Sequence, residues 1–212
     1  MKLYYFAGAC SLADHIVLEW IGRPYEAQRT THALTKSPEY LALNPNGAVP
    51  VLIDGDFVLT QNAAVLFYLA DRNPFAGLLG DGSPRQRADI LRWLCFLNSD
   101  VHPAFKPIFR PAAFHPDESM ASAIKDTARQ NIRRYLDVLE RQLDGRDWLV
   151  DRRSIADPYL FVLLRWAVRF QVDTLGLSHL AAFLARMYAD PCVRAALIAE
   201  EDSIDVETRM LT

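Results

Sequence analysis

The sequence predicts an α/β domain followed by an all-α domain, and three observations support this division. Strand and helix signals alternate from the first residue to Pro74. The segment 75–84 is rich in glycine and serine, as is typical of a linker between domains. After this segment the apolar residues recur only at helical spacing. We therefore expect domains at 1–74 and 85–212, joined by the linker 75–84.

The first elements of the α/β domain follow from short apolar runs separated by turn residues. A strand is expected over 2–6, where aromatic residues precede a glycine-containing turn. Apolar residues at helical spacing follow Ser11, and Gly22 with Pro24 closes that helix. Residues 25–31 are expected to form a second strand.

The same alternation continues to the end of the α/β domain. Ser37 and Pro38 can start a short helix, because proline is tolerated at the first helical position. A hairpin is expected over 51–59, where two strand-like runs flank an Asp-Gly turn. Thr60 can cap a last helix that ends before Pro74. The predicted order is therefore β-α-β-α-β-β-α.

The all-α domain is predicted from helical periodicity alone. The expected helices lie at 85–112, 117–143, 155–171, 178–189 and 191–200. The ends of such helices are fixed only to within a few residues by the sequence. Residues 204–212 form a polar tail whose order the sequence does not predict.

The composition of the chain excludes two classes of protein. Its 212 residues are 51% hydrophobic and 23% charged, which is ordinary for a globular protein and excludes disorder for most of the chain. The formal net charge of -3 offers no basic excess for a phosphate backbone. We therefore expect no nucleic-acid partner.

The first residues and the longest apolar runs bear on location. The opening run from Met1 to Phe6 soon reaches the charged Asp14, too early for the apolar core of a signal peptide. No uninterrupted apolar run approaches the roughly 20 residues that span a bilayer. We therefore expect a cytoplasmic protein with no membrane partner.

The three cysteines are far apart and form neither a Cys-x-x-Cys pair nor a Cys/His cluster. A disulfide framework and a structural zinc site are therefore not expected. Cys10 lies where a strand has ended and a helix begins, so backbone N–H groups and the helix dipole favour its thiolate. This makes Cys10 a candidate nucleophile, the alternative being a small buried apolar residue. Cys192, after Pro191 near a helix start, is expected to pack.

Two local patterns have a direct physical interpretation. Val49-Pro50 precedes a strand, where a cis bond would turn the preceding backbone toward a ligand and a trans bond would only start the strand. Ser154-Ile155-Ala156-Asp157 fits a capping box. In such a box the Ser154 hydroxyl accepts from the Asp157 N–H, and the Asp157 carboxylate accepts from the Ser154 N–H. Its expected role is structural.

These patterns together resemble the cytosolic glutathione transferases. The likeness rests on the loop 44–50, the strand–helix order around it and the box 154–157. The runs Met1 to Tyr5 and Ala9 to Leu12 look more closely like the bacterial beta class, and the likeness covers nearly the whole chain. It implies a thioredoxin-like glutathione-binding domain, an all-α domain that lines the electrophile site, glutathione as cosubstrate, a detoxifying homodimer and no metal.

The resemblance implies a set of glutathione-binding residues. Pro50 matches a cis proline of the family, and Val49, after Ala48, matches the residue that pairs with the cysteinyl backbone of glutathione like an added strand. Gln61 and Asn62 lie where helix-start N–H groups bind the γ-glutamyl carboxylate. Asn62 departs from the usual serine, although its amide can donate to a carboxylate. The alternative for both residues is ordinary polarity of a first helical turn.

The catalytic candidates lie at the end of the first strand. Cys10 matches the characteristic cysteine of the beta class. Ser11 can donate to the glutathione sulfur, as the matching serine does in other classes, or can be a plain helix cap, and both roles are compatible. Tyr5 can offer its phenol to the same sulfur, the alternative being core packing.

The resemblance also implies cleft residues in the all-α domain. His102 matches a histidine that lines the active-site cleft, as a hydrogen-bonding residue and not an essential base; alone it would be a packed or solvated residue. Pro103 replaces a common lysine, for which Lys106 or Arg110 can compensate. Cys95 lies seven residues before His102, and we expect it in the core with some approach to the ligand. We expect Asp100 to lie near the glutathione amine of a neighbouring subunit.

We therefore expect a glutathione transferase in which the glutathione thiolate attacks a hydrophobic electrophile. The electrophile would rest near Phe105, Phe109, Phe114 or Trp166. Two alternatives stay open. The chain can be a glutathione-dependent thiol reductase or peroxidase in which Cys10 forms a mixed disulfide. It can also be a non-catalytic interaction protein on the same scaffold, given the departure at Asn62.

Overall fold

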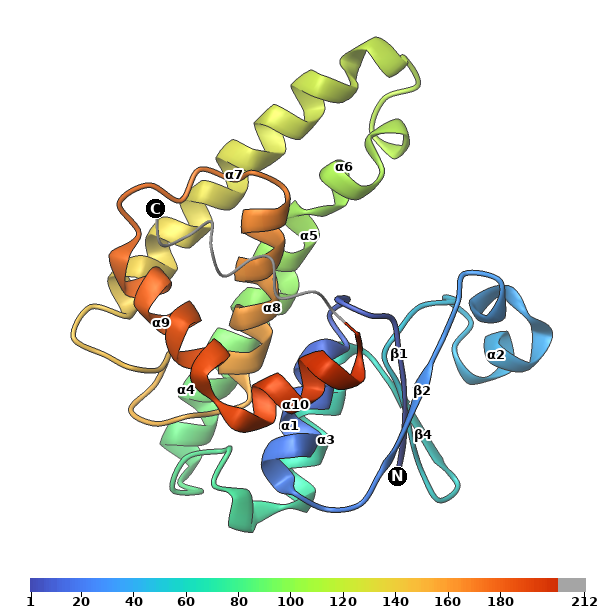
Figure 1. Ribbon diagram of the computed structural model, residues 1–212, viewed down its shortest axis with the longest axis vertical. Coiled ribbons are helices and arrows are strands. Elements are labelled where there is room, and N and C mark those ends of the chain that lie inside the picture. Colours follow the sequence, from blue (N-terminus) through green and yellow to red (C-terminus); the bar gives the residue numbers. More distant parts are fainter. Residues whose placement is uncertain (202–212) are drawn as a thin grey trace.

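The computed structural model describes residues 1–201, and the chain builds a small sheet with helices followed by a larger helical part (Figure 1). The elements of the first part occur in the predicted order. They are β1 (Lys2–Tyr5), α1 (Leu12–Ile21), β2 (Glu26–Arg29), α2 (Pro38–Leu43), β3 (Val51–Asp54), β4 (Phe57–Thr60) and α3 (Asn62–Arg72). The predicted tail 204–212 lies outside the described residues.

The sheet has the strand order β2-β1-β3-β4. β1 pairs with β2 in parallel and with β3 antiparallel, and β3 and β4 form the predicted hairpin. Leu3 and Tyr5 of β1 are buried while their neighbours are partly exposed, because successive strand residues point to opposite faces. In Figure 1, α1 and α3 lie on one side of the sheet, between it and the helical part, and α2 lies on the other side.

The helical part contains one long helix, one fully buried helix and several short ones. They are α4 (Pro84–Phe96), α5 (His102–Ala104), α6 (Lys106–Phe109), α7 (Ala121–Gln142), α8 (Ala156–Arg169), α9 (Ser178–Ala189) and α10 (Pro191–Ala199). All residues of α8 except Arg169 are buried, which is typical of a helix at the centre of a domain. α1 packs against both α8 and α10, so the two parts share a core. Among the described residues, no helix combines the length and apolar character needed to span a membrane.

The single helix expected over 85–112 was wrong. α4 ends at Phe96 and passes into a π-helical segment, Leu97–Val101, followed by short pieces. Pro103, Pro107 and Pro111 each stand in the first turn of a new short helix. A proline lacks the N–H and its ring clashes with the carbonyl four residues earlier, so a helix is interrupted at each one.

Two other expectations are corrected at helix starts. Thr60 is the last residue of β4, and Gln61, with φ 75° and ψ 112°, occupies the cap position of α3. In the predicted capping box, the Asp157 carboxylate accepts from the Ser154 N–H at 2.7 Å as expected. The Ser154 hydroxyl instead donates to that carboxylate at 3.0 Å and accepts from the Ala156 N–H at 3.3 Å.

The segment 75–84 is folded against the helical part. Leu78 and Leu79 are buried, and the Leu78 carbonyl accepts from the N–H of Ile155, just before α8, at 3.2 Å. The connection therefore belongs to the packed core and helps to fix the first part of the chain relative to α8.

Candidate active site

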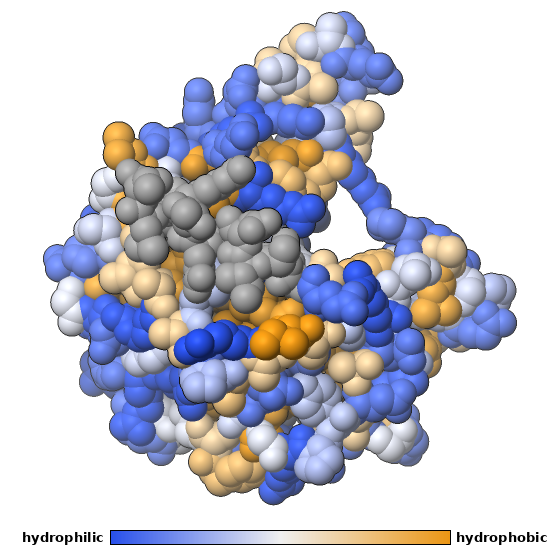
Figure 2. All heavy atoms as spheres, in the orientation of Figure 1, coloured by the Kyte–Doolittle hydropathy of each residue, from blue (hydrophilic) through white to orange (hydrophobic). Residues whose placement is uncertain are grey.

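A cleft of about 750 Å³ lies where the sheet part meets the helical part. Its sheet side consists of the turn 6–10 after β1 and residues 29–32 at the end of β2. Its helical side consists of His102, Phe109, Trp166, Arg169 and Phe170. Figure 2 shows the surface hollowed between the lobe that carries α2 and the projecting end of α7. This position, at the carboxyl end of β1 and at the start of α1, is where sequence reasoning expected the reacting sulfur.

The turn after β1 is held from both sides by the helical part. The Gly8 carbonyl accepts from the Trp166 indole N–H at 2.8 Å. The Gly8 N–H donates to the Glu200 carboxylate at 3.0 Å, and the other oxygen of Glu200 lies 3.0 Å from Nδ1 of the buried His15. Gly8 has φ 68°, a backbone conformation that favours glycine. The shape of the turn therefore depends on residues more than 150 positions away.

Cys10 lies on the cleft but is only 8% exposed, and its thiol donates to the Val49 carbonyl with Sγ and O 3.8 Å apart. Burial, together with the nearby Asp14 carboxylate, raises the pKa of the Cys10 thiol to about 12. The helix-start N–H groups of Cys10 and Ser11 oppose this shift but are outweighed. The helix start favours the thiolate as expected, but burial and one carboxylate outweigh this effect, so the pKa is raised overall.

The structure directs Ser11 and Tyr5 away from the cleft. Ser11 is fully buried, and its hydroxyl oxygen accepts from the Phe6 N–H at 3.3 Å and lies 3.4 Å from the Phe6 carbonyl. It closes the turn after β1 instead of capping α1 or facing a sulfur. The Tyr5 phenol donates to the Ala199 carbonyl of α10 at 3.3 Å, because Tyr5 is on the face of β1 that packs under the helices. Neither side chain is among those that line the cleft, and both make structural contacts.

The loop before β3 is fixed by its own side chains. The Val49–Pro50 peptide bond is cis. Tyr40 and Asn44 both donate to the Ala48 carbonyl, at 2.9 and 2.7 Å. Pro50 is buried, Val49 is partly exposed and Ala48 is exposed. The backbone of Val49 is therefore presented beside Cys10 by a braced loop.

Gln61 and Asn62 have different environments at the start of α3. Gln61 is exposed, so its side chain can reach a ligand at this helix end. Asn62 is 5% exposed, and with its amide nitrogen facing inward it donates to the Cys10 carbonyl at 3.0 Å and to Asp14 Oδ2 at 2.9 Å. The assignment of Asn62 to glutathione is therefore corrected: its amide joins α3 to α1. Burial raises the pKa of Asp14 well above its ordinary value, and the Glu200 carboxylate adds to this shift.

His102 lies on the cleft as expected. Its ring packs edge-on against Trp166 and Tyr159, with centroids 4.9 and 5.9 Å apart. Nδ1 lies 2.6 Å from the Tyr159 hydroxyl. Burial, aided by the positive charge of Lys106, lowers the pKa of His102 to about 4, so the imidazole is neutral at physiological pH.

Three other candidates of the helical part lie elsewhere. Cys95 and Asp100 are exposed and lie outside the described lining of the cleft, and Asp100 accepts from the Ser99 hydroxyl at 2.7 Å. The core position expected for Cys95 was wrong, because the π-helical segment between Cys95 and His102 breaks the seven-residue repeat. Lys106 is exposed and influences the site through its charge on His102. Cys192 is partly buried on α10.

The aromatic side of the cleft contains two of the four expected side chains. Phe109 is 42% exposed, and its ring centroid lies 5.2 Å from that of Trp166 and 5.3 Å from that of Phe170. Phe105 is fully buried behind them. Phe114 instead lines a separate apolar groove against α7. The cleft therefore offers a partly open aromatic surface at Phe109 and Trp166.

Sequence reasoning missed several residues of the site. Arg29, His32 and Arg169 add basic groups to the cleft, and no sequence pattern pointed to them. Tyr159, behind His102, could have been found: it precedes Trp166 by seven residues on α8, and this spacing places both on one face of the helix.

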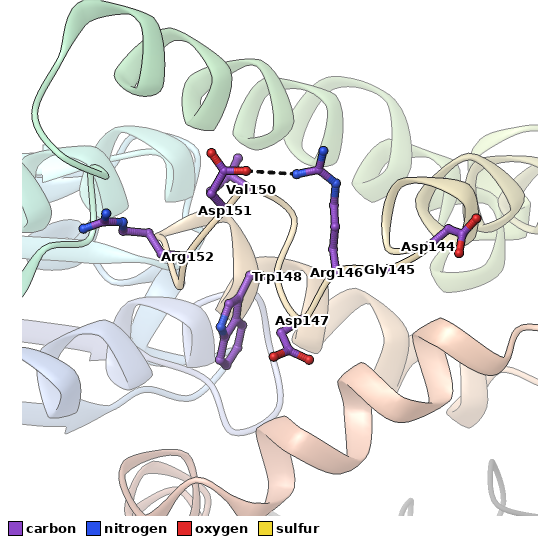
Figure 3. A pocket seen from close by; sticks show the side chains of 8 residues that line it. All are labelled: Asp144, Gly145, Arg146, Asp147, Trp148, Val150, Asp151 and Arg152. Atoms are coloured by element: carbon purple, nitrogen blue, oxygen red, sulfur yellow. Dashed lines mark hydrogen bonds and ion pairs between the residues drawn. The ribbon is translucent and has the colours of Figure 1, made fainter.

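A second hollow, of about 600 Å³, lies at the loop between α7 and α8. Figure 3 shows its mixed charges, with Arg146 joined to Asp151 by an ion pair of 3.1 Å. Asp147 is paired with Arg186 at 2.5 Å. Because two of its aspartates are already paired with arginines, the cleft at Cys10 is the better candidate site.

The chain matches the models of two protein families. Residues 1–71 match "Glutathione S-transferase, N-terminal domain" and residues 97–191 match "Glutathione S-transferase, C-terminal domain". A curated relative, glutathione S-transferase GST-4.5 of Xanthomonas campestris, is 50% identical over 201 residues, which cover 94% of this chain and 98% of the relative.

Two solved structures extend the comparison. A sphingomonad glutathione S-transferase complexed with glutathione is 37% identical with a TM-score of 0.84, over 96% of this chain and 100% of that one. A bacterial beta-class glutathione S-transferase of Sphingomonas chungbukensis is 36% identical with a TM-score of 0.82, over 94% and 98% of the two chains. The fold and the sequence therefore point to the same relatives.

Proposed function

The chain belongs to the glutathione S-transferase family, and from this premise we propose that it transfers glutathione to a hydrophobic electrophile held in the cleft between its two domains. The observation that carries the proposal is that one cleft joins the turn at the start of α1 to the aromatic side chains Phe109 and Trp166. One side offers backbone groups for a peptide and the other an apolar surface. Both are required for a reaction between a thiol peptide and an apolar compound.

Glutathione would lie along the sheet side of this cleft. The exposed Gln61 and the backbone N–H groups at the start of α3 can receive the γ-glutamyl carboxylate. The Val49 backbone can pair with the cysteinyl residue as an added strand does. The sulfur then reaches the turn 8–10, where the Cys10 thiol can donate to it after leaving the Val49 carbonyl. These residue roles remain proposals, as do the domain limits 1–74 and 85–212.

Conjugation is favoured over the thiol-reductase alternative by the state of Cys10. A mixed disulfide requires a Cys10 thiolate, and burial raises the pKa of this thiol to about 12. Conjugation requires only the thiolate of glutathione, which is itself a strong nucleophile. The non-catalytic alternative has no specific observation in its favour among the described residues.

The proposal also covers the oligomeric state of the protein, its location in the cell and its physiological role. We propose a homodimer, because the exposed apolar side chains Phe57, Val58 and Leu91 remain uncovered in the single chain. A dimer would also bring Asp100 near the glutathione amine of a partner subunit, as the resemblance implies. We further propose a cytoplasmic enzyme of detoxification, with no metal, nucleic acid or membrane partner.

Calorimetry with glutathione tests the proposal directly. We expect binding by the wild-type chain and a roughly tenfold weaker affinity for Gln61→Ala, because a hydrogen bond to a carboxylate contributes about 1.5–3 kcal/mol. Gln130→Ala, an exposed glutamine on α7, serves as the matched control and should bind as the wild type does. Absence of binding at millimolar glutathione would overturn the proposed function. An unchanged affinity of Gln61→Ala would overturn only the role of Gln61.

A further inference from the structure

A buried set of polar side chains lies behind His102. Tyr159 of α8 is fully buried, and its hydroxyl lies 2.6 Å from His102 Nδ1 and 3.3 Å from Asn98 Oδ1. The three side chains connect α8 and the π-helical segment to His102, which lines the cleft from the helical side.

Counting protons decides which way these hydrogen bonds run. A tyrosine hydroxyl has one proton to donate and can accept in return. Asn98 Oδ1 can only accept, and the Tyr159 hydroxyl donates to it at 3.3 Å. With its proton committed to Asn98, the hydroxyl oxygen accepts the hydrogen bond from His102, and Nδ1 carries the proton.

We propose that Tyr159 is a positioning residue that holds His102 in the Nδ1–H tautomer, so that the Nε2 lone pair faces the cleft as the acceptor for the glutathione thiol proton. This inference rests on the proposed function. In this proposal, the hydrogen bond between Tyr159 and Nδ1 determines how the glutathione thiol is oriented at Nε2, on the opposite side of the imidazole ring. None of the described residues forms a hydrogen bond with Nε2, which is the ring nitrogen remote from Tyr159.

The electrostatics of the histidine fit this role. Because burial and Lys106 lower the pKa of His102 to about 4, the lone pair on Nε2 is present throughout the neutral pH range. During attack, the sulfur–carbon bond forms as the S–H bond breaks, and the proton moves to Nε2. The leaving group departs with its electron pair. Because an imidazole of pKa about 4 is a weak base, Nε2 takes the proton only as the sulfur–carbon bond forms, and the imidazolium then passes it to water.

The tautomer can be measured on the free protein, without glutathione. The probe is the nitrogen-15 shift of the His102 ring nitrogens, which separates protonated from unprotonated nitrogen, with His102→Gln identifying its signals among those of the 5 histidines. We expect Nδ1–H in the wild type and loss of that preference in Tyr159→Phe, which removes only the hydroxyl. Nε2–H in the wild type, or an unchanged tautomer in Tyr159→Phe, would overturn the proposal.

Steady-state kinetics distinguish a positioning role of Tyr159 from a purely structural one, because a positioning role lowers kcat and leaves KM nearly unchanged. We expect Tyr159→Phe to lower kcat for conjugation about tenfold or more while KM for glutathione stays within about twofold. Tyr68→Phe, which removes a hydroxyl bonded to Asp54 outside the cleft, is the control for the loss of a tyrosine hydroxyl. Equal kcat values for the Tyr159 variant and the wild type would contradict the proposal.

A second variant covers a failure of Tyr159→Phe to fold. Asn98→Leu removes one acceptor of the Tyr159 proton and should weaken the Nδ1–H preference, and an unchanged tautomer would count against the proposal. Calorimetry separates the two levels of inference. Glutathione binding with the wrong tautomer overturns only the role of Tyr159, whereas no binding overturns the function and leaves the tautomer result standing.

Discussion

The reactivity of Cys10 relative to Cys95 is the sharpest prediction of the structure. Cys10 is 8% exposed and the pKa of its thiol is raised from 9.0 to about 12, whereas Cys95 is exposed on α4. At pH 8 a thiol with a pKa of 12 is thiolate about once in 10⁴ molecules, against about one in ten for an ordinary thiol. The more basic thiolate is a better nucleophile, which restores a factor of about 20. The net expectation is alkylation of Cys10 roughly 50-fold more slowly than an ordinary exposed thiol, before steric hindrance is added.

The assay is alkylation by iodoacetamide at pH 8, followed by quantification of the two cysteine peptides by mass spectrometry. Cys95 is an internal reference, so the comparison needs no second protein. The Cys10 rate should rise about tenfold for each pH unit up to the pKa, because only the thiolate reacts. Asp14→Asn should raise the Cys10 rate severalfold, since the Asp14 carboxylate is the second largest cause of the raised pKa. Alkylation of Cys10 at a rate within a few-fold of Cys95 would refute the reasoning and restore the thiol-reductase alternative.

Two further predictions concern stability and activity. Burial raises the pKa of Asp157 from 3.8 to about 6. The folded state therefore binds this proton more tightly than the unfolded state does. The resulting stabilisation is complete below about pH 4 and is lost as the pH rises through about 6. Between pH 4 and pH 7, the unfolding free energy of the wild type should therefore fall by about 3 kcal/mol relative to that of Asp157→Asn. Urea unfolding measures this, and the same wild-type-minus-variant difference at both pH values would contradict the prediction. Tyr5→Phe should leave kcat within about twofold, because its phenol donates to the Ala199 carbonyl; a fall in kcat of tenfold or more in a conjugation assay would return Tyr5 to the catalytic candidates.

The order of elements in the first domain could be predicted because local signals decide it. Gly22 ends α1 in the left-handed conformation, and Pro38 begins α2, both at the positions that the sequence marks. The region 85–112 was predicted as one helix from its apolar spacing, although its three prolines are local signals that interrupt a helix. Only the π-helical segment Leu97–Val101, which contacts α8, has no such signal in the sequence.

The candidate site was predictable where a residue's place at a strand end, or its match to a family motif, puts it beside the cleft. Cys10 and His102 both line the cleft, as does Trp166. Predictions failed where a hydrogen-bond partner comes from a distant segment. Tyr5 bonds to Ala199, and Asn62 to Asp14, and neither partner has a sequence relation to its residue. The sequence also did not predict the protonation state of Cys10, because the helix start is visible in the sequence and the burial of the thiol is not.

The two hydrogen bonds to Gly8 have a consequence for how this protein can change during evolution. Its carbonyl accepts from Trp166 and its N–H donates to Glu200, so the backbone of this turn at the cleft is shaped by the last third of the sequence. A chimaera that combined this first domain with the helices of a distant relative would keep its sheet and lose these two restraints. Recombination between relatives should therefore succeed only where Trp166 and Glu200 are inherited together with the glycine they hold.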